Sequence, residues 1–322
     1  MYVGAEMFTE IKDRATARGI FAKTVVRIEV ETHSYCNRRC SYCPNVVGDR
    51  LGANQHMPQD MWLGMLRDLA EIDYKSNLVL NYYNEPLADR VILDRIREAR
   101  AHLPNARIMI YSNGDYMDPG FVDELAEAGL DYLHISIHLK RGDKYTDLYV
   151  VNRIIEVAVR MGIPARVNKI RSGEFAFATA PHKKMEIEIR GINFHKHGTD
   201  RGGLIDDIHT AEKRTAACYF PFAHFVMSFN GLIAPCCHIR SDRPEHKDYI
   251  YGALRDYGSI FQAFTSAPAA AWRREVSSRR EKRSPCDTCA AGVLPDARAR
   301  DAFEQAHRRH AMAAADAVET TG

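Results

Sequence analysis

The sequence lacks the long apolar run and the leader segment that a membrane or secreted protein needs. None of its apolar stretches approaches the roughly 18–20 residues of a membrane-spanning helix. Glu6 and Glu10 precede any apolar stretch, so the N-terminus is not typical of a secretory signal. The formal net charge is only +2, so no overall charge attracts the chain to nucleic acid or to an anionic membrane. These absences predict a cytoplasmic protein without a membrane or nucleic-acid partner.

Cysteine is scarce for a chain of 322 residues, but it is unevenly distributed. Eight cysteines are too few for a scaffold held together by disulfides. Three lie within eight residues near the N-terminus, and five lie in the last third of the chain. Without a secretion signal, such clusters favour metal or iron–sulfur ligation in a reducing compartment. The cysteines are Cys36, Cys40, Cys43, Cys218, Cys236, Cys237, Cys286 and Cys289.

Runs typical of β-strands alternate with helical patterns from residue 24 to about residue 169. This alternation predicts an α/β fold in which helices cover a parallel sheet. Beyond residue 172 the pattern is looser, with short alternating runs such as those at 185–189 and 225–229. We expect strands at 25–31, 78–80, 107–111, 132–137 and 163–168, and helices at 57–72, 90–101, 119–130 and 147–161.

Polar residues follow successive strands of this predicted sheet. The first strand leads into Cys36–Cys43, and the second into Asn84-Glu85-Pro86. The third ends at Ser112-Asn113-Gly114, and Ser136 lies within the fourth. Because parallel sheets bind ligands at the carboxyl ends of their strands, we expect these side chains to share one site.

The first cysteine group has the spacing C-x3-C-x2-C. A [4Fe–4S] cluster takes one ligand per iron, so three cysteines leave one iron open. A structural zinc site normally closes with four ligands, often as two C-x2-C pairs. His33 is a conceivable fourth ligand, so zinc is the alternative interpretation.

This group, with the aromatic Tyr42 before its last cysteine, resembles the signature loop of the radical S-adenosylmethionine (radical SAM) superfamily. The resemblance implies that Cys36, Cys40 and Cys43 hold a [4Fe–4S] cluster whose open iron binds S-adenosylmethionine. It further implies a 5′-deoxyadenosyl radical that takes a hydrogen atom from the substrate. The cofactors would then supply the chemistry, and the protein their positioning and shielding.

The other strand ends resemble further parts of this family's cofactor site. Asn84-Glu85-Pro86 is similar to the family's Gly-Gly-Glu segment, which makes Glu85 the partner of the methionyl ammonium. The resemblance assigns Tyr42 to the cofactor site as well, and Arg166 or Asn168 either to the cofactor carboxylate or to buried structural pairing. The segment that contacts the ribose is matched by Ser112, Asn113 and Ser136.

The second cysteine group has the pattern C-x12-G-x4-C, followed fifty residues later by C-x2-C. It resembles the SPASM module of radical SAM enzymes in its shortened "twitch" form. The resemblance implies one auxiliary [4Fe–4S] cluster that is fully coordinated and transfers electrons, and Cys237 is left without a role. Four-cysteine structural zinc is the alternative. The four ligands would be Cys218, Cys236, Cys286 and Cys289.

The resemblance extends over about residues 24–290. It implies a partial (β/α)6 radical SAM barrel over 24–205 and a small twitch- or SPASM-like auxiliary-cluster domain over 206–290. Residues 1–23 are expected to be a lead-in, and 291–322 a terminal helix and tail. Since little more than twenty residues precede the first strand, we expect no peptide-recognition or cobalamin-binding domain there, which favours a small substrate.

Radical SAM proteins of this size with a twitch module include an alcohol dehydrogenase of antibiotic biosynthesis. We therefore expect dehydrogenation of a small hydroxylated metabolite, such as an aminocyclitol, sugar or nucleoside, with no catalytic base assigned. The alternatives are radical decarboxylation or carbon–carbon coupling on a nucleoside, peptide modification, and a zinc-binding interaction protein without enzyme activity. The basic segment 273–283 is either a solvated helix face or a docking face for an acidic electron donor such as flavodoxin or ferredoxin.

Overall fold

The computed structural model describes residues 3–48, 50–139, 142–208, 212–294 and 296–319. Its centre is a nine-stranded mixed sheet with the order β5-β6-β7-β4-β3-β2-β1-β8-β9. The six strands from β7 to β8 in this order are parallel, and the strands at both edges are antiparallel. The α/β prediction is confirmed. The strands are β1 (Arg27–Val30), β2 (Asn77–Val79), β3 (Arg107–Ser112), β4 (Tyr132–Ile137), β5 (Arg166–Arg171), β6 (Phe175–His182), β7 (Met185–Ile192), β8 (His224–Met227) and β9 (Ile233–Ala234).

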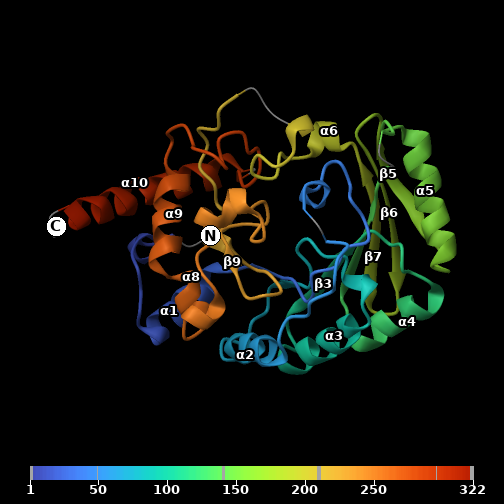
Figure 1. Cartoon of the computed structure of the whole chain (residues 1–322), viewed down its shortest axis with the longest axis horizontal. Coiled ribbons are helices and arrows are strands. Elements are labelled where there is room, and N and C mark those ends of the chain that lie inside the picture. The colour runs from blue at the N-terminus through green and yellow to red at the C-terminus, as the bar shows by residue number, and fades with distance from the viewer. Residues whose placement is uncertain (1–2, 49, 140–141, 209–211, 295, 320–322) are drawn as a thin grey trace.

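Four helices follow successive parallel strands and lie along the outside of the sheet (Figure 1). Their buried apolar faces pack on the outward residues of the strands to form the main core. Capping residues determine where two of these helices begin and end. The side chains of Asp118 and Thr146 cap the N-termini of the third and fourth helices, and Gly129, at φ 100°, ends the third. These helices are α2 (Gln59–Ala70), α3 (Val91–His102), α4 (Pro119–Ala128) and α5 (Asp147–Arg160).

The fifth predicted strand does not occupy the place that the sequence analysis gave it. The run at 163–168 was expected to continue the parallel series next to the fourth strand, and that expectation is wrong. A tight turn at Gly173 (φ 70°) folds β5 back on β6, and a second turn at Lys183 (φ 55°) folds β6 back on β7. It is therefore β7 that pairs in parallel with β4, while β5 lies at the edge of the sheet.

The C-terminal part of the chain returns to the N-terminal strand. β8 pairs in parallel with β1 in the register Arg27↔His224, so the sheet continues past the predicted boundary at residue 205. An unexpected N-terminal helix also packs here, with the Phe21 ring against those of Phe225 and Phe261. The remaining helices are α1 (Arg14–Thr24), α6 (Phe194–His197), α7 (Phe220–Ala223), α8 (Ile260–Phe264), α9 (Ala267–Ser277) and α10 (Ala297–Glu319), and short 3-10 helices occupy Ala5–Phe8, Pro44–Val46, Pro86–Ala88, Asp206–Ile208, Pro244–Tyr249 and Leu254–Asp256.

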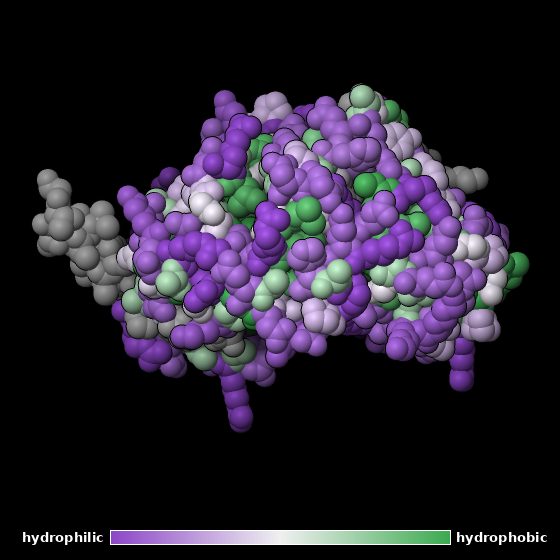
Figure 2. Space-filling view, turned by 90° about the horizontal axis from the view of Figure 1, so that it is seen from below, coloured by the Kyte–Doolittle hydropathy of each residue, from purple (hydrophilic) through white to green (hydrophobic). Residues whose placement is uncertain are grey.

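Among the described residues, no helix is both long enough and apolar enough to cross a bilayer. Figure 2 shows a face that is mostly hydrophilic, with hydrophobic residues in small separate patches. Small patches of exposed apolar side chains are normal on a folded chain.

Candidate functional site

A cavity of about 160 Å³ lies at the carboxyl ends of the parallel strands. Its wall comes from the cysteine loop after β1, the loop after β2, and the ends of β3 and β4. The structure thus brings most of the predicted cofactor residues to one place, as the topology of a parallel sheet favours. Those that line the cavity are Cys36, Cys40, Cys43, Glu85, Ser112, Asn113 and Ser136.

The loop with the first cysteine group is short and is held by its own backbone. The amide of Cys36 donates to the carbonyl of Arg50 (3.0 Å), and the amide of Cys43 to the carbonyl of Cys40 (3.0 Å). Burial raises the pKa of Cys36 to about 12 and that of Cys40 to about 11, and the charge of neighbouring cysteines adds to both shifts. These thiols therefore stay protonated unless a metal takes the place of the proton.

One carboxylate ties this loop to the turn after β3. Asp115 accepts hydrogen bonds from Asn37 Nδ2 (2.8 Å) and from Arg38 Nε (2.7 Å), and Arg38 makes a second bond to it. Asn113 Nδ2 donates to Asn37 Oδ1 (2.8 Å), so the contact is reinforced from the ribose-like turn. Arg38 and Asp115 carry no spacing signal of their own, and the sequence analysis missed them.

Glu85 is a buried carboxylate surrounded by neutral donors. Its side-chain oxygens accept from Ser112 Oγ (2.6 Å), the amide of Asn113 (2.7 Å) and the amide of Leu87 (3.2 Å). Burial outweighs these bonds and raises the pKa of Glu85 to about 7. No cationic side chain among the described residues pairs with it. The carboxylate is therefore suited to a cationic ligand such as an ammonium group.

Two residues assigned to the cofactor lie elsewhere. Tyr42 stacks on Phe194 of α6, with ring centroids 3.7 Å apart, and hydrogen bonds to His138, so it does not line the cavity. Arg166 is exposed on β5, which β6 and β7 separate from β4, so the prediction that it reaches the cofactor is wrong. Asn168, on the same strand, is also exposed and bonds to Thr179.

Arg201 lines the cavity although the sequence analysis gave it no role. It lies in the segment between β7 and β8, with a left-handed backbone at φ 53°. Burial lowers the pKa of Arg201, but the ionisable groups around it, Tyr83 and Cys43 first among them, raise it by more, so it stays charged. Arg201 therefore offers hydrogen-bond donors to an oxygen-bearing ligand in the cavity.

The second cysteine group also gathers in space, in the C-terminal part of the chain. Burial raises the pKa of Cys236, and the charges of Cys237, Cys218, Cys286 and Cys289 add to the shift, so these thiols lie in one region. The same effects raise the pKa of Cys218 to about 11 and of Cys286 still further. The β8–β9 hairpin that brings Cys236 back toward Cys218 turns at Gly231 (φ 80°).

Two features shape this second region. Arg214 bonds the carbonyls of Cys289 (3.0 Å) and Ala217 (2.8 Å), so one guanidinium joins two cysteine-bearing loops. At Gly292, with φ 68°, a Cβ would lie 2.5 Å from Cys218 Sγ, and only glycine fits there. Arg214 also places a positive charge beside the thiols, which complements the negative charge that four thiolates would carry.

The largest charge effects on Cys237 come from other groups than those that act on its neighbour Cys236. Burial raises its pKa, the charge of Glu29 adds to the shift, and the charges of Arg201 and Arg27 oppose it. Cys237 therefore lies near charged groups of β1 and of the segment before β8, and it also acts on the pKa of Cys236.

Both cysteine groups have suitable donors for iron, although in neither group are the described side chains close enough together to bind a metal ion as they stand. No three His, Cys, Asp or Glu side chains stand at metal-binding spacing in the described part of the chain. Thiolate sulfur is the usual donor to iron–sulfur clusters, and each group gathers cysteines with no competing disulfide. The first group would hold a cluster with one open iron, and the second a cluster with none.

The part of the chain that holds the first cysteine group matches a known protein family. Residues 30–161 match the model of the Radical SAM superfamily. They form a radical SAM domain. This domain begins at the end of β1 and closes just after α5, so it contains Cys36–Cys43, Glu85 and the Ser112-Asn113 turn. It implies a [4Fe–4S] cluster with S-adenosylmethionine, as the sequence analysis predicted.

Similar proteins cover most of the chain. The S-adenosyl-L-methionine-dependent 2-deoxy-scyllo-inosamine dehydrogenase of Niallia circulans is 25% identical over 209 residues, which are 65% of this chain and 72% of that protein. The crystal structure of BtrN in complex with AdoMet and 2-DOIA is 20% identical, with a TM-score of 0.56 over 79% of this chain and 87% of that one. BtrN in an open conformation gives 18% identity and a TM-score of 0.53, over 83% and 92% of the two chains. The two structures show a shared fold.

Proposed function

We propose that this protein is a radical SAM dehydrogenase that oxidises a hydroxyl group of a small aminocyclitol in antibiotic or other natural-product biosynthesis. The observation that carries the proposal is the single cavity that unites Cys36, Cys40, Cys43 and Glu85 within the radical SAM domain. Similarity to a 2-deoxy-scyllo-inosamine dehydrogenase supports the substrate class. When bound, the cofactors would supply a 5′-deoxyadenosyl radical able to take a hydrogen atom from the substrate.

The residues of this chain would bind and orient S-adenosylmethionine and the substrate. Glu85 would hold the methionyl ammonium, since it is a buried carboxylate with no cationic partner among the described residues. Ser112, Asn113 and Ser136 would contact the ribose from the ends of β3 and β4. Arg201, which also lines the cavity, would bind a substrate oxygen.

The second cysteine group would complete the oxidation. Removal of a carbinol hydrogen atom leaves a carbon radical, which becomes a ketone when it loses one electron and the hydroxyl proton. A cluster held by Cys218, Cys236, Cys286 and Cys289 would accept that electron, because four thiolates leave no iron free for substrate. Residues 206–290 would form the auxiliary region, although part of it belongs to the central sheet.

Deuterium transfer tests the function. We expect anaerobically reconstituted protein to move deuterium from the carbinol carbon of an aminocyclitol, 2-deoxy-scyllo-inosamine among those assayed, into 5′-deoxyadenosine and to yield the ketone. The same aminocyclitol deuterated at a carbon without a hydroxyl group is the matched control. A decarboxylated or carbon–carbon coupled product from a nucleoside, or a modified peptide, would favour the alternative reactions. Protein with two zinc ions and no 5′-deoxyadenosine would overturn the proposal.

We also propose that an acidic electron carrier such as flavodoxin or ferredoxin docks beside the second cysteine group. A groove of about 790 Å³ lies between α9, α10 and residues 278–283. Five arginines and three glutamates line it, and the Arg283 carbonyl accepts a hydrogen bond from the amide of Cys286. Arg273 is not part of this face, because it is fully buried and donates to the carbonyls of Pro221 and Phe264.

Charge reversal at Arg280 and Arg283 should weaken this contact. For the double variant Arg280→Glu/Arg283→Glu we expect reduced flavodoxin to bind about tenfold more weakly at low salt, measured by calorimetry, because steering between opposite charges is lost. With dithionite as reductant, 5′-deoxyadenosine formation should stay at the level of the unaltered protein. Arg97→Glu, on α3, is the control for charge alone. Unchanged flavodoxin affinity in the double variant would contradict the docking face.

A further inference from the structure

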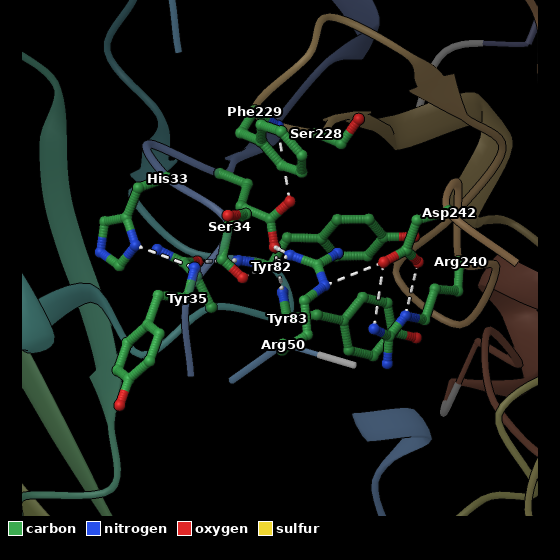
Figure 3. Close-up of polar contacts among 12 residues, drawn as sticks. His33, Ser34, Tyr35, Arg50, Tyr82, Tyr83, Ser228, Phe229, Arg240 and Asp242 are labelled. Atoms are coloured by element: carbon green, nitrogen blue, oxygen red, sulfur yellow. Dashed lines mark hydrogen bonds and ion pairs between the residues drawn. The ribbon is translucent and has the colours of Figure 1, made fainter. Parts of the chain in front are cut away.

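Four charged side chains form a continuous chain of ion pairs between the two cysteine-bearing regions (Figure 3). Arg50, at the end of the first cysteine loop, donates to Glu31 Oε1 (2.8 Å) and to Asp242 Oδ2 (2.9 Å). Asp242 in turn accepts from Arg240 Nε (2.6 Å) and Nη2 (3.1 Å). Glu31 and Arg240 are fully buried, Arg50 is 5% exposed, and the Asp242 side chain keeps 29% of its surface.

Arg240 is also fixed directly to the first loop. Its Nη1 donates to Oδ1 of Asn45 (2.7 Å), which lies two residues after Cys43. Its guanidinium lies over the Tyr83 ring, 5.2 Å from the centroid. At Gly48 a Cβ would lie 2.7 Å from Arg240 Nη2, so the backbone of the loop makes room for this side chain.

The other end of the connection reaches the second cysteine group. Arg240 lies four residues after Cys236. Tyr83, which receives a bond from Asn45 Nδ2 at its carbonyl (3.0 Å), donates its hydroxyl to the carbonyl of Cys237 (3.0 Å). Arg240 and Tyr83 therefore each join the loop of Cys43 to the segment of Cys236 and Cys237, and both bond to Asn45.

Stability does not explain a network of this kind. Removing several charges from water is costly, and well-packed apolar residues often stabilise a fold as much or more. Each guanidinium here makes several directional bonds at once, which apolar side chains cannot do. What the network adds is a fixed distance and orientation between two segments that are nearly 200 residues apart in the chain.

We propose that Arg240 and Asp242 are positioning residues that set the separation of the two cysteine groups and so couple hydrogen abstraction at the first to electron removal at the second. The inference rests on the proposed function. The substrate radical must lose one electron to the auxiliary cluster and one proton before it can decay by another route. Because electron transfer slows steeply with distance, a loosened contact lowers the yield of ketone without preventing S-adenosylmethionine cleavage.

The test compares Arg240→Lys and Asp242→Asn with the unaltered protein. Lysine keeps the charge but cannot bond Asn45 and Asp242 as the planar guanidinium does. We expect 5′-deoxyadenosine formation within about twofold of normal, and ketone per 5′-deoxyadenosine at least threefold lower. Asn45→Ala, which leaves all four charges in place, should lower this ratio less. Arg95→Lys, a buried arginine on α3 that contacts neither cysteine region, is the control and should leave the ratio unchanged.

A second measurement is independent of turnover. In dithionite-reduced protein two clusters at fixed separation broaden each other's electron paramagnetic resonance signals, and we expect this broadening to change in Arg240→Lys and Asp242→Asn. Variants that hold both clusters yet keep the normal product ratio and normal broadening would overturn the proposal. If the unaltered protein cleaves S-adenosylmethionine but oxidises no aminocyclitol, the proposed function fails, while the spectra still decide whether the network positions the two sites.

Discussion

Replacing Cys36, Cys40 or Cys43 with alanine should remove about four irons per chain and reduce 5′-deoxyadenosine formation below detection. Each of the three thiolates would hold one iron, and two ligands do not retain a cluster on this short loop. The three cysteines line one cavity with Glu85, so the loss removes the iron that would face S-adenosylmethionine. Iron analysis and chromatographic assay of 5′-deoxyadenosine measure both effects.

Variants of the second group separate iron loss from loss of radical chemistry. Cys286→Ala should also lose about four irons but still cleave S-adenosylmethionine, because this cysteine lies outside the radical SAM domain. Cys237→Ala should keep all its iron, since the other four C-terminal cysteines complete the ligand set and the largest charge effects on Cys237 come from Glu29 and Arg201. Unchanged iron in Cys40→Ala would show that the first group is not a cluster site. Unchanged iron in Cys286→Ala would do the same for the second.

Much of the site could be predicted because a parallel sheet converts chain order into spatial order. The loop after β2 and the ends of β3 and β4 meet at one edge whatever lies between them, so Glu85, Ser112 and Ser136 share a cavity. Cysteine spacing adds a second signal that depends on one short loop alone. Both signals are local in sequence, and for this reason the site could be predicted from them.

The order of the outer strands could not be predicted in the same way. The alternating run at 163–168 has the same appearance whether it pairs in parallel or in antiparallel fashion. Its partner is set by the turn at Gly173, and β7 then takes the place beside β4. The misplacement of Arg166 follows directly from this, since its strand lies at the edge of the sheet.

Contacts between single residues that are far apart in the sequence could not be predicted either. Arg240 and Asn45 are 195 residues apart, and neither belongs to a repeated spacing that would single it out. Arg201 reaches the cavity only because β8 returns to pair with β1 and brings its flanking segments with it. Such contacts depend on the tertiary pairing of strands and on the packing of loops, which composition and periodicity do not encode.

Glu85→Gln should weaken S-adenosylmethionine binding by about 30- to 1,000-fold, the equivalent of ~2–4 kcal/mol. Glutamine keeps the size of the side chain, but its single acceptor oxygen can replace only one of the two oxygens that accept from Ser112 and Asn113. It also cannot offer a charge to the methionyl ammonium. Calorimetry on reconstituted protein measures the loss. Asp89→Asn, a nearby carboxylate outside the cavity that pairs with His56, is the control and should bind normally.

The pH dependence of binding gives Glu85 a signature of its own. Burial raises its pKa to about 7, above the ordinary value near 4.3, so its carboxyl group is mostly protonated at pH 6 and mostly charged at pH 8. In the ligand-free protein the raised pKa favours folding at low pH, and this contribution is lost as pH rises through about 7. A bound ammonium reverses the preference, because it pairs only with the charged form. Binding therefore releases a proton below pH 7, and affinity should rise about tenfold between pH 6 and pH 8. Glu85→Gln should abolish both the proton release and this slope, and a slope that persists in the variant would assign the titration to another group.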